Sequence, residues 1–117
     1  MTLPALVIDD TASAASAAAA TLSEVGYRVT RCATVGAALT HLSGDTPAVV
    51  VLDLSLDEPH GPLHDALERR GIPVVLVSGV EPESLPAIAR DRRWGYLAKP
   101  YEPDALVAAV ARATGRS

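Results

Sequence analysis

The sequence contains one cysteine, Cys32, among its 117 residues. A single cysteine excludes a disulfide framework and a zinc site built from cysteine ligands. The chain also has no run of ~18 apolar residues, the length that crosses a membrane as a helix. Its N-terminus lacks a basic flank and leads directly into a strand-like segment. We therefore expect no membrane span, no signal peptide and a cytoplasmic protein.

Basic residues are outnumbered by acidic ones. The chain has 10 Lys and Arg residues, 14 Asp and Glu residues and a formal net charge of -4. Because nucleic acids and anionic membranes bind basic surfaces, this balance argues against both as partners. A composition of 49% hydrophobic and 21% charged residues is typical of a folded protein. The length predicts a single domain spanning residues 1–117.

Continuous apolar runs predict strands that are buried on both faces of a sheet. Three such runs are residues 5–8, 48–52 and 73–77, and weaker strand signals cover 27–32 and 94–98. Helical patterns lie between them, at residues 11–25, 35–42, 63–70, 85–91 and 103–113. Thr34 is a candidate N-cap, and Gly26 and Gly71 are candidate helix ends.

Strand and helix therefore alternate along the whole chain. This alternation predicts an α/β fold with a five-stranded parallel sheet, strand order 2-1-3-4-5 and helices on both faces. The arrangement is the doubly wound, flavodoxin-like one, in which ligands bind beyond the carboxyl ends of the strands. The residues that follow each strand are thus the candidates for function.

Ionisable or hydroxylated residues occupy this position after four of the strands. Asp9 and Asp10 follow the first strand, Asp53 the third, Ser78 the fourth and Lys99 the fifth. Each has a purely structural alternative, since Asp10 could cap the first helix and Ser78 could belong to a turn. Their joint placement at one edge of one sheet favours a shared site.

Three carboxylates at one edge repel one another, and a bound cation removes that conflict. Carboxylate oxygens with water are the ligands that Mg²⁺ prefers. Lys99 adds a positive charge that can hold a phosphoryl oxygen, and Ser78 adds a hydroxyl donor. In such a setting the carboxylate of Asp53 can act as a nucleophile and form an acyl phosphate.

With these residues in place, the chain resembles the receiver domain of two-component response regulators over its full length. The resemblance is to chemotaxis-regulator-like receivers of the stand-alone, single-domain type. It rests on the acid pair at 9–10, on Asp53 and Ser78, and on the Tyr-Leu-Ala-Lys-Pro-Tyr segment at 96–101.

The resemblance implies a set of roles at the phosphorylation site. Asp53 would accept phosphate from a phosphohistidine of a sensor histidine kinase or a histidine phosphotransfer protein. Asp9, Asp10, Asp53 and the backbone carbonyl of Ser55 would hold Mg²⁺. Lys99 would contact the phosphoryl group. The protein would catalyse only its own phosphorylation and dephosphorylation and would otherwise be no enzyme.

It also implies a switch. Ser78 would move toward the phosphoryl group, and the aromatic ring of Tyr96 would change rotamer with it. The Lys99–Pro100 bond would be cis. The output would act in trans. Either a downstream protein target binds the fourth helix, fifth strand and fifth helix, roughly residues 85–113, or the domain shuttles phosphate between partners. Trp94 and Tyr101 are expected near that face, with the alternative that Trp94 only covers the edge of the sheet. The chain is expected to be a monomer or weak dimer.

Two residues depart from the family pattern, since Asp57 replaces a usual proline and Pro86 interrupts the fourth helix. His60 and His64 are expected to be a solvated pair rather than metal ligands. Three other functions stay open: a binding module that does not use phosphate, a Mg²⁺-dependent phosphohydrolase and a flavin-binding protein. The chain has no P-loop and no dinucleotide-binding glycine pattern.

Overall fold

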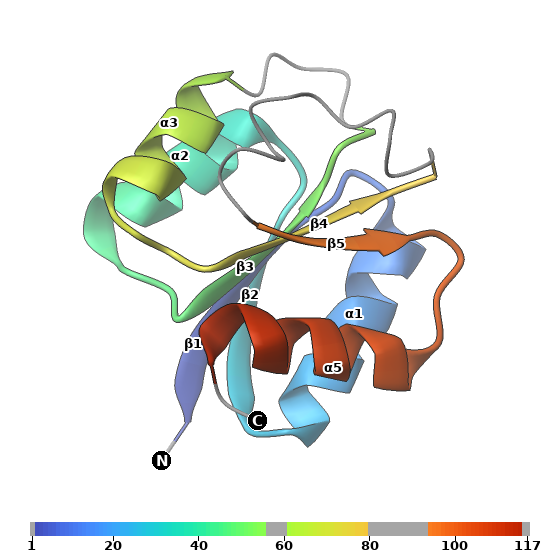
Figure 1. Ribbon diagram of the computed structural model, residues 1–117. Coiled ribbons are helices and arrows are strands. Elements are labelled where there is room, and N and C mark those ends of the chain that lie inside the picture. The colour runs from blue at the N-terminus through green and yellow to red at the C-terminus, as the bar shows by residue number, and fades with distance from the viewer. Residues whose placement is uncertain (1, 56–60, 80–93, 116–117) are drawn as a thin grey trace.

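The computed structural model describes residues 2–55, 61–79 and 94–115. Its centre is a five-stranded sheet with the order β2-β1-β3-β4-β5, in which every neighbouring pair is parallel (Figure 1). The predicted fold and strand order are therefore confirmed. The strands are β1 Leu3–Ile8, β2 Tyr27–Cys32, β3 Val49–Asp53, β4 Val74–Ser78 and β5 Gly95–Ala98.

Helices cover both faces of this sheet. Helices α1 and α5 lie together on one face, and α2 and α3 lie on the other (Figure 1). Their bounds are α1 Ala12–Glu24, α2 Val35–Gly44, α3 Gly61–Arg69 and α5 Pro103–Thr114. The predicted helix at 85–91 lies outside the described residues. No helix in the described part of the chain is long and apolar enough to cross a membrane.

Local sequence signals explain where the helices begin and end. Thr34 caps α2, because its side chain accepts a hydrogen bond of 3.0 Å from the backbone N–H of Ala37. Gly26 and Gly71 follow α1 and α3 with φ values of +99° and +65°, a conformation that favours glycine. The N-cap of α1 is Thr11, so the alternative reading of Asp10 as the cap of this helix is wrong.

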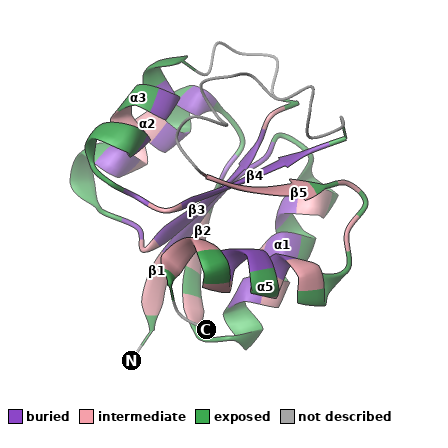
Figure 2. Ribbon diagram, viewed as in Figure 1, coloured by how far each residue is buried: buried purple, intermediate pink, exposed green. Residues whose placement is uncertain are grey.

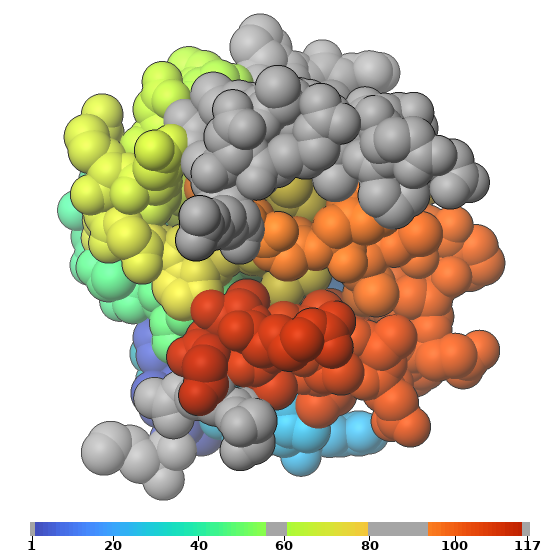
Figure 3. All heavy atoms as spheres, viewed as in Figure 1, coloured from blue at the N-terminus to red at the C-terminus, as the bar shows by residue number. Residues whose placement is uncertain are grey.

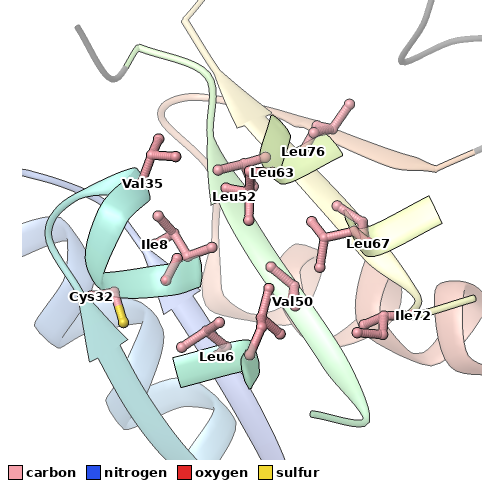
Figure 4. Close-up of a cluster of buried hydrophobic side chains, with 13 residues drawn as sticks. Leu6, Ile8, Cys32, Val35, Val50, Leu52, Leu63, Leu67, Ile72 and Leu76 are labelled. Atoms are coloured by element: carbon pink, nitrogen blue, oxygen red, sulfur yellow. The ribbon is translucent and has the colours of Figure 1, made fainter. Parts of the chain in front are cut away.

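The core consists of two apolar layers separated by the sheet. Buried side chains of the strands alternate between the layers, because successive residues of a strand point to opposite faces. One layer lies under α2 and α3 and includes Leu6, Ile8, Leu52, Leu63 and Leu67 (Figure 4). The other lies under α1 and α5. Strands β3 and β4 are buried along their whole length, as continuous apolar runs predict (Figure 2).

The strand register brings the functional candidates to one edge of the sheet. Ile8 pairs with Leu52, Asp53 with Val77, and Ser78 with Ala98. The last residues of β1, β3, β4 and β5 therefore lie side by side, and the residues that follow them project at the same edge.

Candidate functional site

Asp53 is the last residue of β3 and the most deeply buried group of the site, with 1% of its surface exposed. Ser55, two positions later, holds this carboxylate in place. The backbone N–H of Ser55 donates to Oδ1 at 2.9 Å, and its hydroxyl lies 2.8 Å from both Oδ1 and Oδ2. The sequence indicated only the backbone carbonyl of Ser55 as functional. A hydroxyl residue two positions after the acid was the available signal for this contact.

Three carboxylates converge at this edge. Oxygen atoms of Asp9, Asp10 and Asp53 all lie within 4.8 Å of one another. Asp9 is buried and its Oδ1 accepts a 2.9 Å hydrogen bond from the N–H of Thr11, whereas Asp10 is exposed. A cluster of carboxylate oxygens with one open, exposed side fits Mg²⁺, which takes oxygen ligands and keeps several waters.

Lys99 places its ammonium between two of these carboxylates. Its Nζ lies 3.2 Å from Oδ2 of Asp53 and 3.3 Å from Oδ2 of Asp9. The backbone N–H of Lys99 donates to the carbonyl of Ser78 at 2.8 Å, which fixes the start of the side chain at the sheet edge. The Lys99–Pro100 bond is cis, as the resemblance implied. Lys99 is the only lysine in the sequence.

Burial and neighbouring charges together set the pKa values of this site. Burial by itself would raise the pKa of Asp53, but the hydrogen bonds from Ser55 and the charge of Lys99 outweigh it and lower that pKa. Burial raises the pKa of Asp9, and the negative charge of Asp53 adds to the effect. Burial would lower the pKa of Lys99, yet the two carboxylates raise it. Asp53 is thus the group held ready as an anion.

Replacing Asp9 by asparagine is expected to raise the melting temperature of the metal-free protein by a few degrees. A raised carboxyl pKa stabilises the fold only at low pH, and that contribution is lost as the pH rises through the folded pKa. At pH 7 the charge of Asp9 is therefore a cost, and the neutral amide oxygen can still accept from Thr11. Thermal unfolding in chelator tests this, with exposed Glu24→Gln as the unchanged control. A lower melting temperature would show that the ion pair with Lys99 outweighs the cost.

Ser78 and Tyr96 lie beside the acidic cluster on neighbouring strands. Ser78 is buried at the end of β4, and the hydroxyl of Tyr96 lies 3.5 Å from the backbone carbonyl of Ser78. The same carbonyl accepts from the backbone of Lys99. The backbone carbonyl of Ser78 therefore contacts both Tyr96 and Lys99. The switching roles of the Ser78 and Tyr96 side chains stay predictions.

The prediction that His64 belongs to a solvated histidine pair is wrong. His64 is buried, with 4% exposure, and its ring packs edge-on against Trp94 at a centroid distance of 5.5 Å, so it is not half of a solvated pair. Trp94 packs on the layer under α2 and α3, whereas Tyr101 packs on the layer under α1 and α5. The two aromatics therefore lie on opposite sides of the sheet, and their place on the output face stays a prediction because residues 80–93 lie outside the described residues. Asp57, His60 and Pro86 lie outside the described residues.

Comparison with known proteins identifies the family of this chain. A profile of the response regulator receiver domain family matches residues 5–111. No curated protein sequence matches significantly. NtrX from Brucella abortus, solved in complex with ADP, is similar with a TM-score of 0.86 and 25% identity. That similarity covers 98% of this chain and 27% of NtrX, so the chain spans only part of that protein.

Two further structures match over nearly their whole length. Chemotaxis response regulator CheY4 of Vibrio cholerae has a TM-score of 0.82 and 20% identity, with 97% of this chain and 99% of CheY4 covered. The DrrB receiver domain in its BeF3-activated form has a TM-score of 0.83 and 26% identity, with 99% and 100% covered.

Proposed function

Because this chain belongs to the response regulator receiver domain family, we propose that it is a phosphorylation switch of two-component signalling. Asp53 accepts a phosphoryl group from a phosphohistidine on a sensor histidine kinase or a histidine phosphotransfer protein. The observation that carries the proposal is the Asp53 carboxylate, buried, held by Ser55 and 3.2 Å from the Lys99 ammonium.

The transfer itself needs few parts. An Asp53 oxygen forms the new O–P bond while the N–P bond of the phosphohistidine breaks and the imidazole leaves. The lowered pKa of Asp53 keeps the nucleophile ionised near neutral pH. Lys99 offsets the negative charge that spreads over the phosphoryl oxygens during transfer. Mg²⁺, held by Asp9, Asp10, Asp53 and the carbonyl of Ser55, would neutralise further charge there.

The phosphoryl donor needs access to this edge, and a groove beside Lys99 supplies it. The groove has a volume of about 240 Å³ and is lined by Ala14, Ala17, Thr21, Lys99, Pro100, Tyr101 and Pro103. Small side chains on α1 leave room for a helix of the partner to approach closely. We propose that the kinase or phosphotransfer protein binds over α1 and the segment between β5 and α5.

The negative charge of the phosphoryl group drives the change that a target protein recognises. Close to two negative charges and new acceptor oxygens at the sheet edge attract the hydroxyl of Ser78, and Tyr96 follows on the neighbouring strand. A target protein then binds the face that includes β5 and α5. A difference of ~1–3 kcal/mol between the two states changes target affinity several-fold or more. We place this receiver in the cytoplasm, where ATP supplies its phosphodonors.

Intact mass spectrometry tests the proposal. Incubation with Mg²⁺ and acetyl phosphate is expected to add the mass of one phosphoryl group, and hydroxylamine is expected to remove it. The Asp53→Asn variant and a sample with excess chelator should keep the unmodified mass. An unmodified wild-type chain would leave a binding module that does not use phosphate, and a modification that persists in Asp53→Asn would assign the acceptor elsewhere.

Phosphorylation is expected to change the fluorescence of Trp94, the one tryptophan of the chain. Trp94 and Tyr96 pack on the same apolar layer, so a rotamer change of Tyr96 alters the surroundings of the indole. The measurement is an emission spectrum before and after addition of acetyl phosphate. Ser78→Ala should still be phosphorylated on Asp53 but should lose most of the spectral change. An equal change in emission in the wild type and in Ser78→Ala would show that the Ser78 hydroxyl does not take part in the switch.

A further inference from the structure

Tyr101 brings a phenol hydroxyl to the groove beside Lys99. Its ring is half-buried on the apolar layer under α1 and α5, and it lines the groove together with Lys99 and Thr21. The other lining residues are alanines and prolines, which have no polar side chain. Figure 3 shows β5 and the segment that leads to α5, in orange, uncovered on one side of the molecule. A partner can therefore reach this part of the groove.

The three polar side chains of the groove differ in what they already contact. The ammonium of Lys99 lies against two carboxylates of the acidic site. The hydroxyls of Tyr101 and Thr21 form no hydrogen bond with any other residue in the described part of the chain. Thr21 lies ~14 Å along α1 from the first residue of that helix, which follows the acid pair. Tyr101 is therefore the uncommitted hydroxyl on the side of the groove where Lys99 lies.

The charges of the acidic site act on the phenol of Tyr101. Burial raises the pKa of this phenol, the positive charge of Lys99 lowers it, and the negative charges of Asp9 and Asp53 raise it further. The net effect is upward, so the hydroxyl keeps its proton at neutral pH and can donate a hydrogen bond. The same effects place the hydroxyl within electrostatic reach of the group that accepts phosphate.

A phosphohistidine needs a donor at this point, whereas an acyl phosphate does not. When the N–P bond breaks, its electron pair goes to the imidazole nitrogen, while an oxygen of Asp53 forms the new O–P bond. A hydrogen-bond donor stabilises that nitrogen as the pair develops. Acetyl phosphate instead releases acetate, a stable anion that leaves without a proton. Because the displacement is in line and Asp53 is buried, the leaving nitrogen lies on the exposed side of the phosphorus atom.

We propose that the Tyr101 hydroxyl donates a hydrogen bond to the imidazole of the phosphohistidine and so speeds transfer from this class of donor over transfer from acyl phosphates. This inference rests on the proposed function, in which Asp53 is the acceptor. The groove of about 240 Å³ suits a single five-membered ring, since pockets for drug-sized ligands begin at ~300 Å³. Its alanine and proline walls give the faces of the ring apolar contact.

Phosphorylation rates with two small donors, measured by intact mass in Mg²⁺, test this role. Phosphoimidazole carries the leaving ring of phosphohistidine, and acetyl phosphate carries none. Tyr101→Phe removes only the hydroxyl and is expected to slow phosphorylation by phosphoimidazole about 5–10-fold more than phosphorylation by acetyl phosphate, the effect of one hydrogen bond in the transition state. Both donors act on the same Asp53, so the ratio of the two rates cancels any general effect of the substitution on the fold.

Tyr27→Phe is the matched control, because Tyr27 packs on the same apolar layer but begins β2, at the opposite end of the sheet. It should keep the wild-type ratio of rates. A wild-type ratio in Tyr101→Phe would show that the ring of Tyr101 only packs, and it would overturn the proposal. So would a wild type that acetyl phosphate modifies and phosphoimidazole does not, a result that leaves the proposed function intact. A wild type that neither donor modifies would overturn the proposed function itself.

Discussion

Lys99→Met is expected to slow the phosphorylation of Asp53 by acetyl phosphate by about 10²–10³-fold, the usual loss when a group that stabilises transition-state charge is removed. Methionine keeps the length of the side chain and removes only the ammonium. That ammonium lies 3.2 Å from Asp53, at the point where the phosphoryl oxygens would gather. Without it, the carboxylates of Asp9 and Asp53 also repel each other more strongly, which raises the pKa of the nucleophile.

The measurement is the initial rate of phosphorylation by intact mass at saturating Mg²⁺. Arg28→Met makes the same change of charge at an exposed position of β2 and should leave the rate unchanged. A wild-type rate in Lys99→Met would show that the lysine does not act on the phosphoryl group. The ionic state of Lys99 can be followed separately, because a chain with a single lysine gives one side-chain amine signal by NMR.

Leu52→Ala is expected to lower the free energy of unfolding by about 3 kcal/mol, a large part of the ~5–15 kcal/mol of a typical domain. Leu52 is fully buried and lies in a row across the sheet, between Ile8 on β1 and Leu76 on β4. Its side chain points into the layer under α2 and α3 (Figure 4). Removing it leaves a cavity that neighbours on three strands cannot fill without shifting the strand that carries Asp53.

Urea denaturation at constant m-value measures this loss. Val25→Ala serves as the matched comparison, because Val25 is 49% exposed and its truncation should cost little. A loss below 1 kcal/mol for Leu52→Ala would mean that the layer collapses into the space. In that case the position of Asp53 should move, and the phosphorylation rate should fall without a loss of stability.

The sheet could be predicted from the sequence because its central strands are buried on both faces. The runs at 48–52 and 73–77 are continuous and β-branched, and they became β3 and β4 with shifts of a residue at their ends. Helix ends were also predictable where one residue decides them, as with the Thr34 cap and the positive φ at Gly26. The strand order followed from the connection rules of parallel sheets rather than from any one residue.

Side-chain placement could be predicted less well. The burial of His64 was missed because hydropathy favours solvent for a histidine, although Leu63 and Leu67 place position 64 on the inward side of α3. Trp94 and Tyr96 differ by two positions and share a face, whereas Tyr101 follows the end of the strand and turns to the other layer. The spacing of Ser55 after Asp53 suggests a contact between them, but the hydroxyl contact also depends on a rotamer that the sequence does not fix.

The lone lysine has a practical consequence for attaching this protein to dyes or surfaces. The primary amines available to amine-reactive reagents are the α-amino group and the side chain of Lys99. Because the neighbouring carboxylates raise the pKa of Lys99, its amine stays protonated and unreactive at pH 7, whereas an α-amino group has a pKa near ~8. Coupling at neutral pH should therefore tether every molecule by its amino end. Since β1 begins at the edge of the sheet opposite Asp53, immobilised molecules would present the acidic edge uniformly to a partner in solution.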